Sequence, residues 1–173
     1  MTQGTAASKS TAALIAELEQ EIKTTRRLLE RVPGDKLSWR PHTKSMSLGQ
    51  LALHVATVPA GIARILANDT CEVPQFKQAE AMSAAELIRA LDESLQTARG
   101  FLSGLDDARA VATWKLMKNG RELMAMPRIR VVRMLMLNHW YHHRGQLSVY
   151  LRMLNVPVPS IYGPSADENP FAT

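Results

Sequence analysis

Hydrophobic residues recur every three or four positions in four long stretches of the chain, which is the spacing of an amphipathic helix. The first stretch covers residues 10–32 and stops at Pro33-Gly34. The second begins at Ser47 and runs to about Ala67, with Gln50 in the position of a capping-box partner. We therefore predict two helices in the N-terminal part of the chain, with a defined start to the second.

Two further helices are predicted after a mixed, loop-like segment over residues 68–82. One begins at Ser83, which again has an acidic residue three positions later, and continues to about residue 103. The other is the longest amphipathic stretch, from Pro127 to Leu154, and a proline is common in the first turn of a helix.

The connections carry weaker signals. Residues 35–45 include Trp39 and are expected to form an extended stretch with anchoring side chains. Residues 113–126 alternate around Asn119-Gly120, which predicts a small hairpin or a long loop with too few partners for an independent sheet. Pro59 lies inside the second predicted helix and is expected to bend it.

Aromatic residues make up only 5% of a chain that is 46% hydrophobic, and this composition favours helices. The predicted fold class is all-α, an antiparallel four-helix bundle with a small hairpin or long loop before the last helix. At 173 residues the chain is expected to form a single domain over 1–173. Within it, residues 1–9 are expected to be frayed and residues 160–173 to be an ordered tail.

Two histidines four positions apart, His139 and His143, fall on the apolar stripe of the last predicted helix. Side chains at this spacing are neighbours, so two imidazoles can bind one metal ion at about 2.0–2.1 Å per bond. His54 lies near the inner face of the second helix, and three rings that meet between helices would leave a metal with a vacant position. The alternative is that these are core histidines, hydrogen-bonded to the backbone or to each other.

Three residues beside this pair are open to more than one interpretation. His142 points away from His143 on an ideal helix, so it is expected to lie outside the ligand set. Arg144 is either an anion contact or a surface charge, and Gln146 either supports a ligand or is an ordinary amide on the helix face. No glutamate follows His139, so the helix-borne base of the zinc proteases is absent.

The formal charge is +5, and the basic excess is concentrated between Lys115 and Arg152, where eight basic residues face Glu122 alone. Such a region could be a solvated basic face or could attract a small anionic ligand. No nucleic-acid-binding motif accompanies it, so a nucleic-acid partner is not expected. The single cysteine, Cys71, the absence of a long apolar run and the polar start favour a cytoplasmic protein with no membrane partner.

Four segments together resemble the DinB-like superfamily of metal-dependent helical proteins. They are Trp39-Arg-Pro-His42, Ser47-Leu-Gly-Gln-Leu-Ala-Leu-His54, Asn138-His-Trp-Tyr-His-His-Arg-Gly-Gln146 and the tail Pro159-Ser-Ile-Tyr-Gly-Pro-Ser-Ala-Asp-Glu168. The resemblance covers nearly all of the chain. It implies an up-down-down-up bundle, often dimeric, in which His54, His139 and His143 bind a divalent metal ion, with zinc or nickel expected first.

The resemblance implies a reaction less sharply than a metal site, because fold does not fix chemistry. Relatives include thiol S-transferases, so the leading hypothesis is an enzyme in which the ion binds a low-molecular-weight thiol and the basic half holds its anionic groups. A metal-dependent hydrolase and a non-enzymatic metal-binding or stress-response protein are the alternatives. An open cavity at the histidines would favour an enzyme, and a closed one would favour a structural role.

Overall fold

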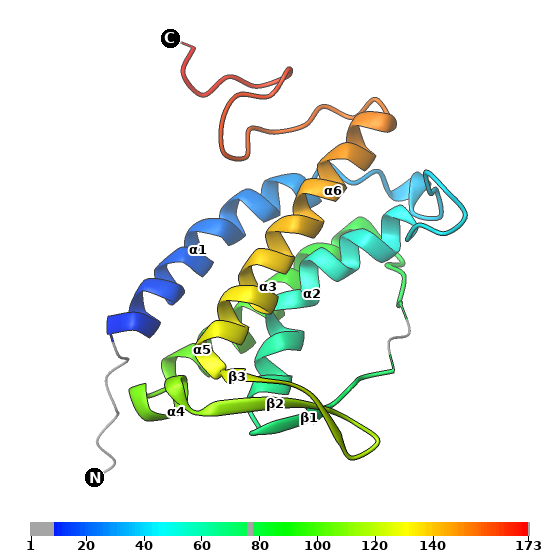
Figure 1. Ribbon diagram of the computed structural model, residues 1–173. Coiled ribbons are helices and arrows are strands. Elements are labelled where there is room, and N and C mark those ends of the chain that lie inside the picture. The colour runs from blue at the N-terminus through cyan, green and yellow to red at the C-terminus, as the bar shows by residue number, and fades with distance from the viewer. Residues whose placement is uncertain (1–8, 76–77, 173) are drawn as a thin grey trace.

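Helices form most of this protein, as the hydrophobic periodicity predicts (Figure 1). The computed structural model describes residues 9–75 and 78–172. Of the segment 1–9 that was predicted to be frayed, residues 1–8 lie outside the described residues and Lys9 is the first residue of α1. The elements in chain order are α1 (Lys9–Leu29), η1 (Gly34–Lys36), α2 (Leu48–Leu66), β1 (Thr70–Glu72), α3 (Ala84–Ser103), α4 (Asp107–Val111), β2 (Thr113–Lys118), β3 (Arg121–Pro127), α5 (Arg128–Val131), η2 (Val132–Asn138) and α6 (His139–Met153).

Polar side chains begin α2 and α3 where the sequence predicts. The Ser47 hydroxyl accepts the Gln50 N–H, and the Gln50 side chain accepts the Ser47 N–H at 2.9 Å, so the predicted capping box of α2 is complete. At α3 the Ser83 hydroxyl accepts the Glu86 N–H in the same way. The second box is only half formed, because the Glu86 carboxylate accepts the N–H of Met82 instead of that of Ser83.

The core lies between the long helices, with α2 packed against both α3 and α6 and with α1 against α3 (Figure 1). Leu18, Leu51, Leu91 and Leu147 are fully buried in it or nearly so. By length and apolar composition α2 could cross a membrane, but 56% of its apolar window is buried inside the protein. Burial of this kind is what the central helix of a folded core requires.

A small sheet at one end of the helices corrects the all-α prediction. The predicted hairpin is present: β2 and β3 pair antiparallel, and Asn119 and Gly120 turn between them with φ of 52° and 76°. A third strand, β1, pairs in parallel with β2 inside the segment that was predicted to be a loop. Three residues are too short to give a periodic signal, and their partner lies more than forty positions away. The local sequence therefore could not reveal this strand.

The last predicted helix is divided into three parts. Pro127 is the final residue of β3 and has extended backbone angles, so the prediction that it lies in the first helical turn is wrong. After the short α5, residues 132–138 form the wider turns of a π-helix, and α6 begins at His139. Because a π-helix turns through a smaller angle per residue than an α-helix, it changes which later residues face the core.

The segments before α2 and after α6 both make hydrogen bonds with the rest of the fold. Residues 35–45 contain η1 and turns instead of the predicted extended stretch. The expected anchor is present, because the Trp39 carbonyl accepts the Leu48 N–H at 2.7 Å and its ring packs edge-on against Tyr150. In the tail, the Asp167 carboxylate pairs with Arg152 and accepts the Val158 N–H. These contacts join the tail to the end of α6, while an ordered tail over residues 160–173 stays a prediction.

Pro59 interrupts the hydrogen bonding of α2 at its centre, and Figure 1 shows the helix bending there. A proline has no N–H, so the carbonyl four residues earlier, that of Val55, loses its helical donor. The Nε1 of Trp140 donates to this carbonyl at 2.7 Å. On the other side of the proline, the Ala60 N–H donates to the buried Ser94 hydroxyl at 3.0 Å. Side chains from α6 and α3 thus replace the bonds that α2 lacks.

Trp140→Phe should lower the free energy of unfolding by about 1–3 kcal/mol, because it leaves the buried Val55 carbonyl without a donor. Denaturant titration measures this loss. In a Pro59→Ala background, residue 59 regains an N–H that can reach the same carbonyl, so the cost of Trp140→Phe should become smaller. An equal cost in the two backgrounds would show that the indole acts by packing alone.

Candidate metal centre

Three histidines from two helices meet in a single cluster. His54 comes from α2, and His139 and His143 come from α6. Each offers a ring nitrogen, and these nitrogens all lie within 4.8 Å of one another. No other group of three potential ligands is present among the described residues. The structure therefore brings together the set of residues predicted from the sequence.

The position of each ring follows from the helices that carry it. His139 and His143 are one turn apart on α6, and their ring centroids lie 4.3 Å from each other. His54 precedes Val55, whose carbonyl accepts the indole N–H of Trp140, the residue after His139. This hydrogen bond fixes the position of α6 along the axis of α2 beside the cluster. It thereby places His54 opposite the pair.

The spacing of the nitrogens fits a bound ion. The Nε2 atoms of His54 and His139 lie 3.2 Å apart. Two nitrogens at about 2.05 Å from a tetrahedral zinc ion would lie about 3.3 Å apart. The Nδ1 of His143 donates to the Gln146 side-chain oxygen at 2.7 Å, which leaves its Nε2 lone pair free for an ion. Of the two interpretations for Gln146, the structure thus favours support of a ligand.

Burial holds the three rings in the neutral form that binds metals. It lowers the pKa of His54 to about 4, with further lowering from the charges of His143 and His139. Burial is also the main cause that lowers the pKa of His139 and of His143. Because a ligating imidazole must be unprotonated, little energy is needed to prepare this cluster for an ion at neutral pH.

His142 lies outside the cluster, as predicted. Its side chain is exposed, although its ring packs edge-on against His143 with 5.0 Å between centroids. A mutation at this position therefore changes the surroundings of the cluster without removing a ligand. It supplies a natural control for the three others.

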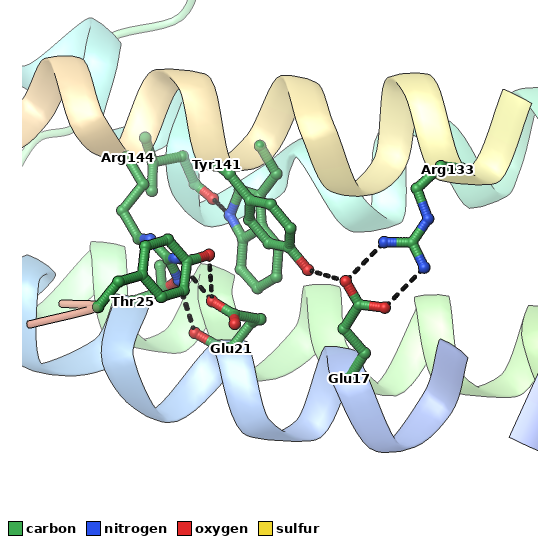
Figure 2. A network of polar contacts seen from close by, with 9 residues as sticks. Glu17, Glu21, Thr25, Arg133, Tyr141 and Arg144 are labelled. Atoms are coloured by element: carbon green, nitrogen blue, oxygen red, sulfur yellow. Dashed lines mark hydrogen bonds and ion pairs between the residues drawn. The ribbon is translucent and has the colours of Figure 1, made fainter. Parts of the chain in front are cut away.

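Arg144 is neither an anion contact nor a surface charge, the two roles considered from the sequence. Its charge is buried. Its side chain is 1% exposed and forms an ion pair with Glu21 of α1 at 2.6 Å. The guanidinium also lies over the rings of Tyr141 and Tyr162, 5.1 and 5.0 Å from their centroids. Figure 2 shows this network between α1 and the last helix. Arg144 therefore holds helices together and is not available to an anionic ligand.

Four of the other seven basic residues between Lys115 and Arg152 also form ion pairs. Carboxylates from α1, from the loop before β1, from β3 and from the tail pair with them. The ion pairs are Lys115–Glu122, Arg128–Asp69, Arg133–Glu17, Arg144–Glu21 and Arg152–Asp167. Five of the eight basic residues between Lys115 and Arg152 are thus paired with carboxylates within the fold.

A cavity of about 580 Å³ opens beside the cluster. His54 and His139 line it, together with α2 residues near Pro59 such as Thr57 and Gly61. The cavity therefore lies beside His54 and the residues around Pro59. Sequence reasoning missed the opposite wall, to which Trp114 and Leu116 of β2 contribute. Nothing in their local pattern indicates that the hairpin would fold back beside α2.

We expect about one divalent ion per chain, and its loss from His54→Ala, His139→Ala and His143→Ala, because each substitution removes one of three ligands. Elemental analysis of the purified proteins measures the content. His142→Ala is the matched control and should keep full occupancy. Full metal content in the three ligand variants would contradict this assignment.

The metal-free protein should become less stable as the pH falls from about 6.5 to about 4. His54 has a lowered pKa in the folded state, so the unfolded chain binds more protons in this window and protonation favours unfolding. The expected loss is about 1–3 kcal/mol, measured by denaturant titration with a chelator present. His54→Gln should remove this part of the pH dependence. A pH profile identical to wild type would show that His54 is not the group responsible.

Comparisons with known proteins agree with this architecture. The model of the DinB family matches residues 3–170. YrdA of Bacillus subtilis, an uncharacterized protein, is 28% identical over 159 residues, which cover 87% of this chain and 86% of YrdA. Among solved structures, a DinB-like protein of Bacillus cereus has a TM-score of 0.66 at 23% identity and covers 85% of this chain and 94% of its own.

A second solved structure, the DinB-like protein YjoA of Bacillus subtilis, has a TM-score of 0.63 at 18% identity. The match covers 84% of this chain and 96% of YjoA. At these identities the solved structures support the fold alone, whereas the family model spans nearly the whole sequence. The chain belongs to the DinB family.

Proposed function

We propose that this protein is a metal-dependent enzyme of the thiol S-transferase type, in which His54, His139 and His143 hold a divalent ion, zinc or nickel. The observation that carries the proposal is the place where the rings meet. Two of them, His54 and His139, line an open cavity of about 580 Å³, so the cluster is not enclosed in the core. A cluster that served only to stabilise the fold would have no need of such a space.

A divalent ion bound to three imidazoles would lower the pKa of a thiol that joins it, so that the sulfur reacts as a thiolate at neutral pH. The chain supplies the positions. Gln146 accepts a hydrogen bond from the Nδ1 of His143 and so orients its ring. His54 and His139 line the cavity, where an electrophile can lie. In such a transfer the sulfur electron pair would form the new bond to carbon, the leaving group would depart with the old bonding pair, and the thiol proton would pass to solvent.

The lining of the cavity favours this reaction over hydrolysis. Hydrolysis of an ester or amide needs proton transfer between water, an acid or base, and the leaving group. Among the described residues that line the cavity, none is a carboxylate, a lysine or a tyrosine. A thiolate needs no such base once it is formed. A non-enzymatic metal-binding or stress-response role is less well supported, because the cavity is open.

The ion pairs described above give little support to a partner other than a small molecule. The ion pairs of the C-terminal half leave few free cations for a nucleic-acid backbone, so we propose no role in nucleic-acid binding. The same pairs remove most of the basic residues that were expected to hold the anionic groups of a thiol. A homodimer and a cytoplasmic location stay predictions that rest on the resemblance and the composition.

The proposal is tested by mixing the metal-loaded protein with a panel of small thiols, including cysteine and glutathione, and 1-chloro-2,4-dinitrobenzene. The absorbance of the thioether gives the initial rate. We expect at least one thiol to react faster than the uncatalysed background. Chelation and His139→Ala should both return the rate to that background, because each removes the ion that activates the sulfur.

His142→Ala is the control, since it alters a neighbouring imidazole but should retain the rate. A rate that survives chelation, or no acceleration with any thiol of the panel, would contradict the transferase proposal. Affinity for duplex DNA is measured in parallel over a range of salt concentrations. Tight binding that ignores the metal and weakens steeply with salt would favour a nucleic-acid function instead.

A further inference from the structure

The cavity beside the histidines has walls that are almost entirely hydrocarbon. Ile62 and Ile65 of α2 form one side, Leu116 of β2 lies opposite, and Leu135 of η2 is next to the histidines. These side chains are only partly buried, so each has apolar surface that a ligand could cover. Removing such surface from water is favourable and requires no specific geometry.

Of the polar side chains in the walls, Thr57 and Trp114 are already engaged within the protein, whereas that of Gln78 is exposed. The Thr57 hydroxyl donates to the Leu53 carbonyl at 2.8 Å. The indole N–H of Trp114 donates to the Ile65 carbonyl at 3.2 Å, so this side chain offers only its ring to the cavity. A polar ligand would lose its bonds to water on entry and find few donors in return.

Formal charge is also missing from the lining. With the histidines neutral, no described residue that lines the cavity carries a charge. Arg133 of η2 and Arg144 of α6 are paired with Glu17 and Glu21 of α1. A ligand carboxylate, sulfonate or phosphate in the cavity would therefore be desolvated without a partner.

We infer that this cavity binds an uncharged, predominantly apolar small molecule. Its volume lies within the range of about 300–1,000 Å³ that is usual for ligand sites. His54 and His139 line the cavity while His143 does not, so one end of the ligand lies beside the histidine cluster. The role of this molecule as the electrophile of the thiol transfer rests on the proposed function, whereas its binding depends on the cavity alone.

A larger side chain at position 61, now Gly61, would fill part of the cavity directly. Gly61 lines the cavity from the middle of α2, and a Cβ atom built on it meets no atom within 4 Å. Gly61→Leu should therefore project a side chain into the cavity without displacing the backbone. Gly100 in α3 is a matched control, because it is a helical glycine with equally open surroundings that lies away from the cavity.

Two probes with the same ring system separate apolar from anionic binding. N-phenyl-1-naphthylamine is uncharged, and 1-anilinonaphthalene-8-sulfonate differs by one sulfonate. In fluorescence titrations the uncharged probe should saturate at about one per chain, and the anionic probe should bind about tenfold more weakly or worse. Gly61→Leu should weaken the uncharged probe about tenfold or more, and Gly100→Leu should leave its affinity unchanged.

Thr57→Leu gives a second test from one turn earlier in α2 and should weaken the same probe. Thermal unfolding of each variant establishes that it is folded. Binding of the uncharged probe that is unaffected in folded Gly61→Leu and Thr57→Leu would overturn the inference. Equal affinity for the two probes in the wild-type protein would overturn it as well.

Repeating the titration with metal-loaded and chelated protein keeps the two proposals distinguishable. The probe should bind in both states, because hydrocarbon walls and not the ion provide the affinity. If the thiol assay fails while Gly61→Leu still abolishes probe binding, the cavity assignment stands and the transferase proposal falls. If thiol transfer occurs but Gly61→Leu affects neither probe binding nor rate, the electrophile binds elsewhere and this inference is wrong.

Discussion

The carbonyl oxygen of Val55, left without a donor by Pro59, is the point on which the arrangement of the site depends. A buried carbonyl with no partner is costly, so the fold must bring a donor from elsewhere. The indole of Trp140 does so from α6. Since Val55 follows His54 and Trp140 follows His139, one hydrogen bond aligns two helices and two candidate ligands together. The same hydrogen bond thus compensates for Pro59 in α2 and aligns the histidine cluster.

Charges are distributed so that the interior around this site is apolar and neutral. Arg144 is buried, yet it finds Glu21 and two tyrosine rings on the side of the helix that faces α1. The side that faces α2 carries the histidines, whose burial disfavours their protonation. Separating these two faces of one helix allows an ion-pair network to hold α1 in place without charging the cavity. The network in Figure 2 is therefore a support of the fold and not an anion site.

The combination of three neutral imidazoles with a hydrocarbon cavity limits the chemistry that the site can support. Apart from the histidines, which are assigned to the ion, the described lining provides no acid or base, so a reaction there has to rely on the ion and on a nucleophile that needs no further proton acceptor. A thiolate meets this requirement better than water does. The apolar walls in turn favour an uncharged partner for that thiolate, because nothing in them would compensate a buried charge.

The sequence by itself determined the four helical stretches, the start of α2, the hairpin turn and the identity of the three histidines that cluster. These features depend on local periodicity, on capping side chains and on residues one helical turn apart. The tertiary structure decided the rest: the strand β1, the π-helical turns before His139, the pairing of Arg144 with Glu21 and the wall that Trp114 and Leu116 give to the cavity. Each of these depends on partners far apart in the chain, and the strength of such a contact is set by burial and geometry that no local pattern encodes.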